Sequence, residues 1–207
     1  MRGKNLGGIK CRLIGRHNVL NMLGAVTAAL EAGAEFGRIA EAALAFGGVK
    51  RRFERVGKVG GIEVIEDYAH HPTEIRSVIK AAGDYTKGRV VTIFQPHRYS
   101  RTKDLLGEFA ECFYGSDVLV LTDIYSAHED AAQKLSTAAI YDLLDKSRFE
   151  RVDLVSKKDI PGFVSGIAKE DDIILVLGAG DIREQAEPLV RELEKKMAGD
   201  RGRARGV

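Results

Sequence analysis

The chain has 207 residues, 44% hydrophobic and 30% charged, which is the composition of an ordinary soluble globular protein with ample length for a buried core. Its 32 Lys and Arg residues against 30 Asp and Glu leave a formal net charge of +2, and the charges are interspersed, so we expect neither a nucleic-acid nor a membrane partner. The only cysteines, Cys11 and Cys112, indicate reduced thiols, and the lack of a long apolar run or a signal-peptide pattern makes the cytoplasm the expected location.

The first part of the chain holds few predicted elements. Residues 9–14 (IKCRLI) predict a strand, and the segment from Gly15 leads into a helix with an apolar stripe. The stripe consists of Val19, Leu23, Val26 and Leu30. A second helix is predicted over residues 35–46, where a pair of glycines ends it. One strand and two helices cannot close a sheet, so we expect residues 1–54 to be the trailing piece of another domain.

From residue 55 onward, strands and helices alternate regularly. Strands are predicted at residues 62–66, 90–94, 118–122, 152–155 and 173–177, the first of them after a glycine turn. Helices are predicted from Pro72, from about Lys103, over residues 137–144, from Ile160 and from Ile182. Short apolar strands joined by single helices predict an α/β fold, with a Rossmann-like, mostly parallel sheet and helices on both faces. We expect one domain over residues 55–197 and a disordered basic tail over residues 198–207.

The stretch IEDYAHHPTEI, from Ile65 to Ile75, combines a strand end, a polar turn and a helix start. Pro72 suits the first helical position, because the N–H that it lacks would be unpaired there. Four polar or aromatic residues therefore follow the carboxyl end of this strand: Asp67, Tyr68, His70 and His71. Ligands bind at this end of the strands in open α/β sheets, so we expect the chemistry here.

Polar residues follow the other strands as well, and the carboxyl ends of parallel strands share one edge. We expect these side chains to converge there: Asp67, His70, His97, Arg98, Arg101, Asp123 and Asp181. Arg98 and Arg101 are three residues apart, so a helix start could place both guanidinium groups on one side as a clamp for a carboxylate or phosphate; a solvated helix start is the alternative. The backbone N–H groups of the turn at residues 178–181 could face an anion.

Two absences limit the chemistry that we expect. The sequence has no HExxH pattern and no cysteine near His70 and His71, so we expect no metal site among these residues. It also has no GxxxxGK[ST] loop. We therefore expect that this chain cannot cradle the phosphates of a nucleoside triphosphate by itself.

Five strings follow one another in a distinctive order. They are GRHNVLN at Gly15–Asn21, GVKRRFE at Gly48–Glu54, DYAHHPTEI at Asp67–Ile75, FQPHRYSRT at Phe94–Thr102 and GAGDI at Gly178–Ile182. In this order and approximate spacing, the chain resembles the Mur ligases over roughly residues 9–190, and most closely those members that join L-alanine to UDP-N-acetylmuramate. The resemblance implies an ATP-dependent amide ligase of peptidoglycan precursor synthesis, in which the carboxylate is activated as an acyl phosphate.

On the nucleotide side, the resemblance implies four binding residues. Asn18 and Asn21 would contact the adenine of ATP. Arg52 would support the ribose and phosphate region, and Asp67 would accept hydrogen bonds from the ribose hydroxyls. ATP and Mg²⁺ are the implied cofactors, and domains absent from this chain would complete both sites.

On the amino-acid side, the resemblance implies three catalytic residues and two substrate-binding residues. His70 would lie next to the reaction centre, and Arg98 with Arg101 would hold the carboxylate of alanine or the intermediate. Tyr68 would shape the amino-acid pocket, and His97 would belong to the same wall. The sequence departs from the family after residues 123–129, so the resemblance assigns no role to Asp123 or His128.

Relative to the family, the chain lacks the domain that binds the UDP-sugar. The resemblance implies that residues 1–54 are only the trailing piece of the central ATP-binding domain, without its phosphate-binding loop. We expect the carboxyl-terminal portion of a ligase that is inactive alone and needs its amino-terminal domains in cis or in trans. One alternative is a sibling ligase that adds a preformed peptide to the muramyl sugar. Others are a binding module for a nucleotide or amino acid that does no chemistry, and a nucleotide-binding regulator built on the same sheet.

Overall fold

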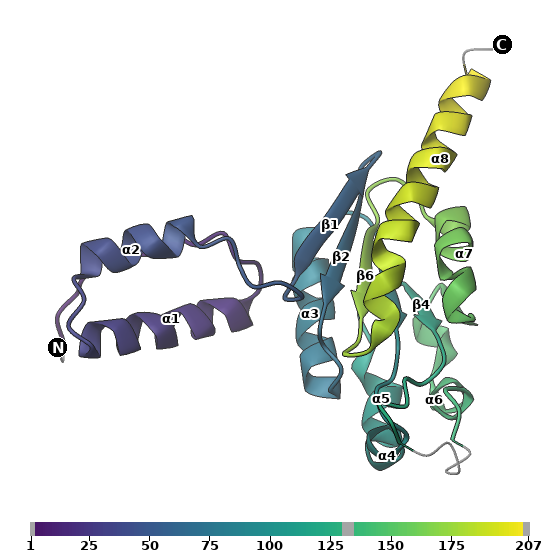
Figure 1. The fold of residues 1–207 in the computed structure, drawn as a ribbon, viewed down its shortest axis with the longest axis horizontal. Helices are drawn as coiled ribbons and strands as arrows, with labels where there is room; N and C mark the ends of the chain where they lie inside the picture. Colours follow the sequence, from purple (N-terminus) through teal and green to yellow (C-terminus); the bar gives the residue numbers. More distant parts are fainter. Residues whose placement is uncertain (1–2, 130–134, 205–207) are drawn as a thin grey trace. The chain divides into compact units, whose positions relative to one another are not determined.

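The computed structural model describes residues 3–129 and 135–204, which form two compact units that divide between Lys50 and Arg51. In the first unit, helices α1 (Arg16–Glu31) and α2 (Phe36–Ala45) pack against each other (Figure 1). The strand predicted at residues 9–14 is wrong, because this segment is irregular. A strand needs a paired neighbour, and the described residues of the first unit contain none.

The first unit buries little apolar surface of its own. Only Val26 of the predicted stripe on α1 is buried, whereas Val19 and Leu23 are about half exposed, at 48% and 55%. On α2, Ile39 and Ala43 are buried. The two helices therefore follow the predicted periodicity, but their apolar faces are only partly covered within this unit.

The second unit is built on a sheet of six strands in the order β1-β2-β6-β3-β4-β5. The strands are β1 (Glu54–Val59), β2 (Ile62–Asp67), β3 (Val90–Phe94), β4 (Val118–Leu121), β5 (Arg151–Leu154) and β6 (Ile173–Leu177). All neighbours pair in parallel except β1, which forms an antiparallel hairpin with β2. Gly60 and Gly61 make the hairpin turn with φ angles of 55° and 86°, which glycine adopts without strain. The mostly parallel sheet predicted from the sequence is confirmed.

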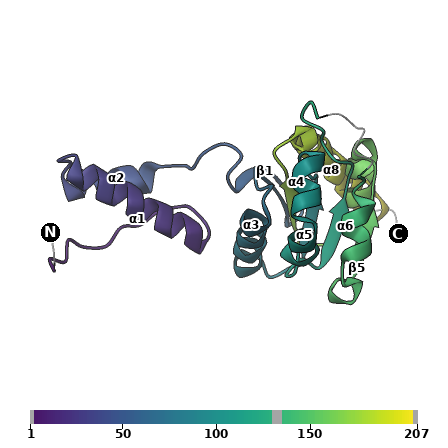
Figure 2. The same ribbon diagram turned by 90° about the horizontal axis from the view of Figure 1, so that it is seen from below.

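Helices cover both faces of this sheet, as Figure 2 shows. The helices are α3 (Pro72–Tyr85), α4 (Tyr99–Asp104), α5 (Leu106–Cys112), α6 (Ala138–Leu143), α7 (Ile160–Ile167) and α8 (Ala186–Ala204). Apolar side chains of α3, α5 and α6 fill one core, and those of α7 and α8 fill a second core on the opposite face. Strand residues alternate between the two cores, since successive side chains of a strand point to opposite faces. Among the described residues, no helix is long and apolar enough to cross a membrane.

Several element boundaries differ from the predicted ones. The helix expected from about Lys103 begins at Tyr99 and is interrupted at Leu105, whose φ of −109° and ψ of 18° separate α4 from α5. The helix expected from Ile182 begins with a 3₁₀ turn, η4 (Asp181–Gln185), before α8. Further 3₁₀ turns are η2 (Lys146–Arg148) and η3 (Lys157–Asp159).

The two ends of the second unit also differ from the predicted domain limits. It starts at Arg51 rather than at residue 55, because backbone groups of Arg51 and Phe53 bond to Tyr68 and Asp67 at the end of β2. At the other end, α8 continues to residue 204, past the predicted start of the tail at 198. Residues 205–207 of that predicted tail lie outside the described residues.

A buried ion pair holds the amino-terminal ends of β3 and β6 together. The Arg89 guanidinium donates from Nη2 and Nε to the two carboxylate oxygens of Asp172, at 2.7 and 3.1 Å. The Asp172 side chain is 1% exposed and also accepts the Lys169 backbone N–H at 2.8 Å. These hydrogen bonds raise the pKa of Arg89 above its ordinary value. Both carboxylate oxygens of Asp172 therefore accept a hydrogen bond from Arg89, and this two-bond pair connects the starts of the two strands.

We expect Asp172→Asn to lower the free energy of unfolding by about 3 kcal/mol, because it leaves the Arg89 charge largely buried without its main partner. Urea unfolding monitored by circular dichroism measures this change. The neighbouring Asp171 is exposed, so Asp171→Asn is a matched control that should stay within about 0.5 kcal/mol. Equal effects of the two substitutions would contradict a structural role for the pair.

Candidate functional site

The carboxyl end of β2 passes directly into a capped helix. His71 is the residue before α3, and Pro72 occupies the first helical position, as predicted. The Glu74 carboxylate accepts the backbone N–H groups of His70 and His71 at 3.1 and 3.2 Å, while the His71 ring accepts the Thr73 N–H. This is a capping box, so His71 has a structural role and the backbone at His70 is fixed.

The tautomer of His70 follows from its hydrogen bond to a carbonyl oxygen. Its Nδ1 lies 2.9 Å from the Tyr68 carbonyl oxygen, which can only accept, so the Nδ1 atom carries the proton. The ring meets the Tyr68 ring edge-on, with centroids 5.1 Å apart. When His70 is neutral, its Nε2 atom therefore keeps a lone pair and can accept a proton.

His97, from the loop after β3, lies beside His70. Their ring centroids are 5.9 Å apart, and the other neighbour of His97 is the Tyr125 ring, stacked at 5.5 Å with 25° between the planes. We call Tyr68, His70, His97 and Tyr125 the aromatic row. The His97 Nδ1 atom lies 3.4 Å from Arg101 Nη1. A guanidinium can only donate, so His97 Nδ1 accepts and the neutral ring carries its proton on Nε2.

Burial lowers the pKa of His97 below its ordinary value, and three positive or protonatable neighbours lower it further: Arg101, His70 and Arg98. Glu129 acts weakly in the opposite direction. His97 is therefore a neutral imidazole near neutral pH, consistent with its acceptor role toward Arg101.

The arginine pair flanks His97. Arg98 is exposed, precedes the first residue of α4 and has a φ of 72°, a left-handed conformation that is rare for a residue with a side chain. Its backbone N–H donates to the Tyr125 carbonyl oxygen at 2.8 Å. Arg101 lies within α4 and reaches back to His97. Because α4 begins at Tyr99 rather than near Lys103, the pair lies at a helix start, and both residues lower the pKa of the same imidazole.

Arg51, which sequence reasoning did not single out, joins three segments at this edge. Its guanidinium donates to Glu66 at 2.9 Å and to the Gly178 carbonyl oxygen at 3.0 Å, and it lies over the Tyr68 ring at 4.5 Å. Arg52 lies over the same ring at 5.8 Å. Two guanidinium groups therefore pack near Tyr68. These contacts connect residues up to 127 positions apart, which no local sequence pattern reveals.

The turn at residues 178–181 is held by Gln95, which sequence reasoning also missed. The Gln95 side chain accepts the Ile182 N–H at 3.1 Å and donates to Asp181 at 2.9 Å. Asp181 also pairs with Lys157, and these bonds lower the pKa of its carboxyl group despite partial burial. Asp181 therefore faces these partners, whereas His70, His97 and Arg101 face one another.

Asp67 is 3% exposed, and its carboxylate accepts hydrogen bonds from nearby backbone N–H groups. One carboxylate oxygen accepts the Phe53 N–H and the other accepts the Ala69 N–H, each at 2.7 Å. In the first unit, Asn18 and Asn21 lie one turn apart on α1, and the Asn18 side chain donates to the Ile14 carbonyl oxygen at 2.7 Å. The nucleotide roles expected for these three residues stay predictions.

The remaining predicted positions take no part in the aromatic row. Asp123 is exposed and lines a separate small pocket with Thr122 and Ser156, at the ends of β4 and β5. His128 is also exposed, with a φ of 69°. Within residues 3–129 and 135–204, no group of three or more His, Cys, Asp or Glu residues could hold a metal ion.

Comparisons with known proteins agree on one family. Residues 51–180 match the family described as Mur ligase, glutamate ligase domain. The chain is similar to the UDP-N-acetylmuramate–L-alanine ligases of Trichlorobacter lovleyi (44% identical) and Desulforamulus reducens (41% identical), in each case over 93% of this chain and 42% of the relative. Among solved structures, it is similar to the UDP-N-acetylmuramate-alanine ligase MurC of Thermotoga maritima, with a TM-score of 0.77 and 30% identity over 94% of this chain and 41% of that one. The chain thus spans about two fifths of the length of these relatives.

We expect His97 to titrate below 6.5 in an NMR pH titration of the folded chain, and Arg101→Gln to move its pKa upward by removing a positive neighbour. Because unfolding restores the ordinary pKa, the unfolded chain binds a proton first as the pH falls. The stability that neutral His97 contributes is therefore present above about pH 6.5 and is lost as the pH falls from there through the folded-state pKa.

Lys103→Gln, on the same helix, is the control for this titration and should leave the His97 pKa unchanged. A His97 pKa at or above 6.5 in the unsubstituted chain would contradict its burial among positive neighbours.

Proposed function

Because the chain belongs to the Mur ligase family, we propose that it is the carboxyl-terminal portion of an ATP-dependent ligase that joins L-alanine to UDP-N-acetylmuramate. The observation that carries the proposal is the grouping of His70, His97 and Arg101 at the carboxyl ends of β2 and β3. The relatives that align with 93% of this chain are named for this reaction, which favours L-alanine as the amino acid.

Arg98 and Arg101 hold the carboxylate of the amino acid in this proposal. Guanidinium groups bind carboxylates through two parallel, charge-assisted hydrogen bonds. Arg101 is already oriented by its contact with His97, and neutral His97 does not repel a neighbouring guanidinium as an imidazolium would. Tyr68, fixed by the Arg51 guanidinium over its ring, limits the space for the amino-acid side chain.

His70 accepts a proton from the amine of the amino acid. An ammonium group has no lone pair with which to attack a carbonyl carbon, so it must lose a proton before the amide bond forms. The Nδ1 atom of His70 donates to the Tyr68 carbonyl oxygen, which leaves Nε2 as the acceptor. The second product is the phosphate released from the activated carboxylate, an acyl phosphate.

ATP supplies the phosphoryl group that activates the carboxylate, and this chain would hold only part of the nucleotide. Asn18 and Asn21 offer side-chain amides that match the donors and acceptors of adenine. Arg52 and Asp67, in the second unit, would contact the ribose and phosphate region. By family resemblance, we propose that Mg²⁺ accompanies ATP and that the part of the longer relatives that this chain does not cover completes both sites.

We expect the purified chain alone to show no L-alanine-dependent ATP hydrolysis, because its sequence lacks a phosphate-binding loop. Adding the amino-terminal part of the Trichlorobacter lovleyi ligase, in trans or fused, should restore ligation of L-alanine to UDP-N-acetylmuramate. Phosphate release and mass spectrometry of the product measure the reaction. Turnover by the chain alone, or ligation of a preformed peptide in place of alanine, would contradict the proposal.

In the restored enzyme, Arg98→Lys should lower kcat/KM for L-alanine at least tenfold, because a lysine keeps the charge but cannot bind a carboxylate through two hydrogen bonds. Lys103→Arg, on the exposed side of the same helix, is the matched control and should keep full activity. Full activity of the Arg98 variant would remove this residue from the site.

A further inference from the structure

Tyr125 is attached to the site by its backbone as well as its ring. Its N–H donates to the Pro96 carbonyl oxygen at 2.9 Å, and its own carbonyl oxygen accepts the Arg98 N–H at 2.8 Å. These two bonds form a parallel bridge between His97 and Tyr125, beyond the ends of β3 and β4. These backbone hydrogen bonds therefore hold the loop that carries His97 in a fixed position relative to the loop that carries Tyr125.

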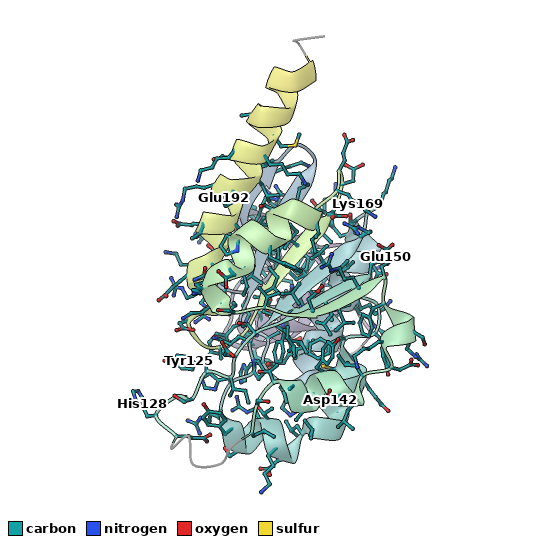
Figure 3. All side chains as sticks on the ribbon, turned by 90° about the vertical axis from the view of Figure 1, so that its right-hand side faces the viewer. Tyr125, His128, Asp142, Glu150, Lys169 and Glu192 are labelled. Atoms are coloured by element: carbon teal, nitrogen blue, oxygen red, sulfur yellow. The ribbon has the colours of Figure 1, made fainter. Side chains whose placement is uncertain are left out.

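The Tyr125 ring lies between His97 and the turn at residues 178–181. It stacks on the imidazole at 5.5 Å. On the turn, a Cβ atom added to Gly180 would lie 2.6 Å from Tyr125 Cγ, so the backbone of the turn packs directly against the ring. Figure 3 shows Tyr125 at the end of the second unit opposite to Lys169 and Glu150. Tyr125 therefore cannot shift without moving His97 or the turn.

We propose that Tyr125 is a positioning residue that fixes the His97 imidazole with Nδ1 toward Arg101, and thereby orients the Arg101 guanidinium. The role rests on the proposed function, because it assumes that Arg101 binds the substrate. His97 has an aromatic ring on either side, His70 and Tyr125. Within the described part of the chain, Arg101, Arg98 and Glu129 are the other ionisable groups that shift its pKa. Of these contacts, the stack on Tyr125 has nearly parallel planes and covers one face of the imidazole.

The orientation of His97 matters because only one tautomer suits Arg101. The neutral imidazole accepts from the guanidinium at Nδ1 only when the proton is on Nε2. A ring turned over about its Cβ–Cγ bond would place Cδ2–H where Nδ1 lies, and a carbon atom cannot accept the guanidinium hydrogen bond. Tyr125 hinders this rotation, because the imidazole would have to pass through orientations that the stacked tyrosine ring occupies, while the backbone bridge holds the His97 main chain.

The test is NMR of the full chain with ¹⁵N-labelled histidine, comparing Tyr125→Phe with Tyr125→Ala. The Phe variant keeps the stacked ring and should preserve both the His97 pKa and the Nε2-protonated tautomer at high pH. The Ala variant exposes the imidazole, so its His97 pKa should rise toward 6.5 and both tautomers should be populated. Tyr85→Ala, at the far end of α3, is the control and should change neither value.

If Tyr125→Ala leaves the His97 tautomer and pKa unchanged, the proposal is overturned. The same holds if Tyr125→Phe changes the His97 pKa and no longer favours the Nε2-protonated tautomer. If the Ala variant does not fold, Tyr125→Leu keeps apolar volume without a ring, and the same two outcomes decide. The measurement uses no substrate, so its result is independent of whether the restored enzyme ligates L-alanine. An inactive enzyme with the expected NMR changes would refute the proposed function and leave the positioning of His97 intact.

Discussion

The parallel register of β2, β6 and β3 is the constraint on which the site depends. Leu177, the last residue of β6, pairs with Asp67 on one side and with Phe94 on the other, so the three strands end at the same level. Every loop that follows them starts from this common edge. Tyr68 and His70 from one loop and His97 from another are neighbours because of that pairing.

The two ends of the strands differ in how their polar groups are used. At the amino-terminal ends, the Arg89 guanidinium donates to both carboxylate oxygens of Asp172 and so connects β3 to β6. At the carboxyl-terminal ends, His70 keeps a free ring nitrogen when neutral, and Arg98 has a left-handed backbone conformation. Strained backbone conformations are characteristic of functional sites, where the surrounding structure must hold them in place. The ion pair thus lies at one end of the sheet, and the candidate site lies at the other.

The aromatic row connects three separate loops. Its rings come from the loops after β2, β3 and β4, and each is also held by a hydrogen bond or a backbone contact. Tyr68 is fixed by Arg51, while Tyr125 is fixed by the turn after β6. A displacement of any one loop would therefore change the environment of His97, which lies in the middle of the row.

The sequence by itself determined the α/β alternation, the two-faced sheet, the capped start of α3 and the presence of His70, His97 and the arginine pair after strands. Each of these depends on local signals: apolar periodicity, a proline at a helix start and polar residues next to strand ends. The strand expected at residues 9–14 failed because pairing, not composition, makes a strand. Only the tertiary structure decided that Asp181 faces Lys157, that Arg51 lies over Tyr68 and that Tyr125 stacks on His97. These contacts follow from the order of the strands in the sheet, because that order brings together side chains that are far apart along the chain.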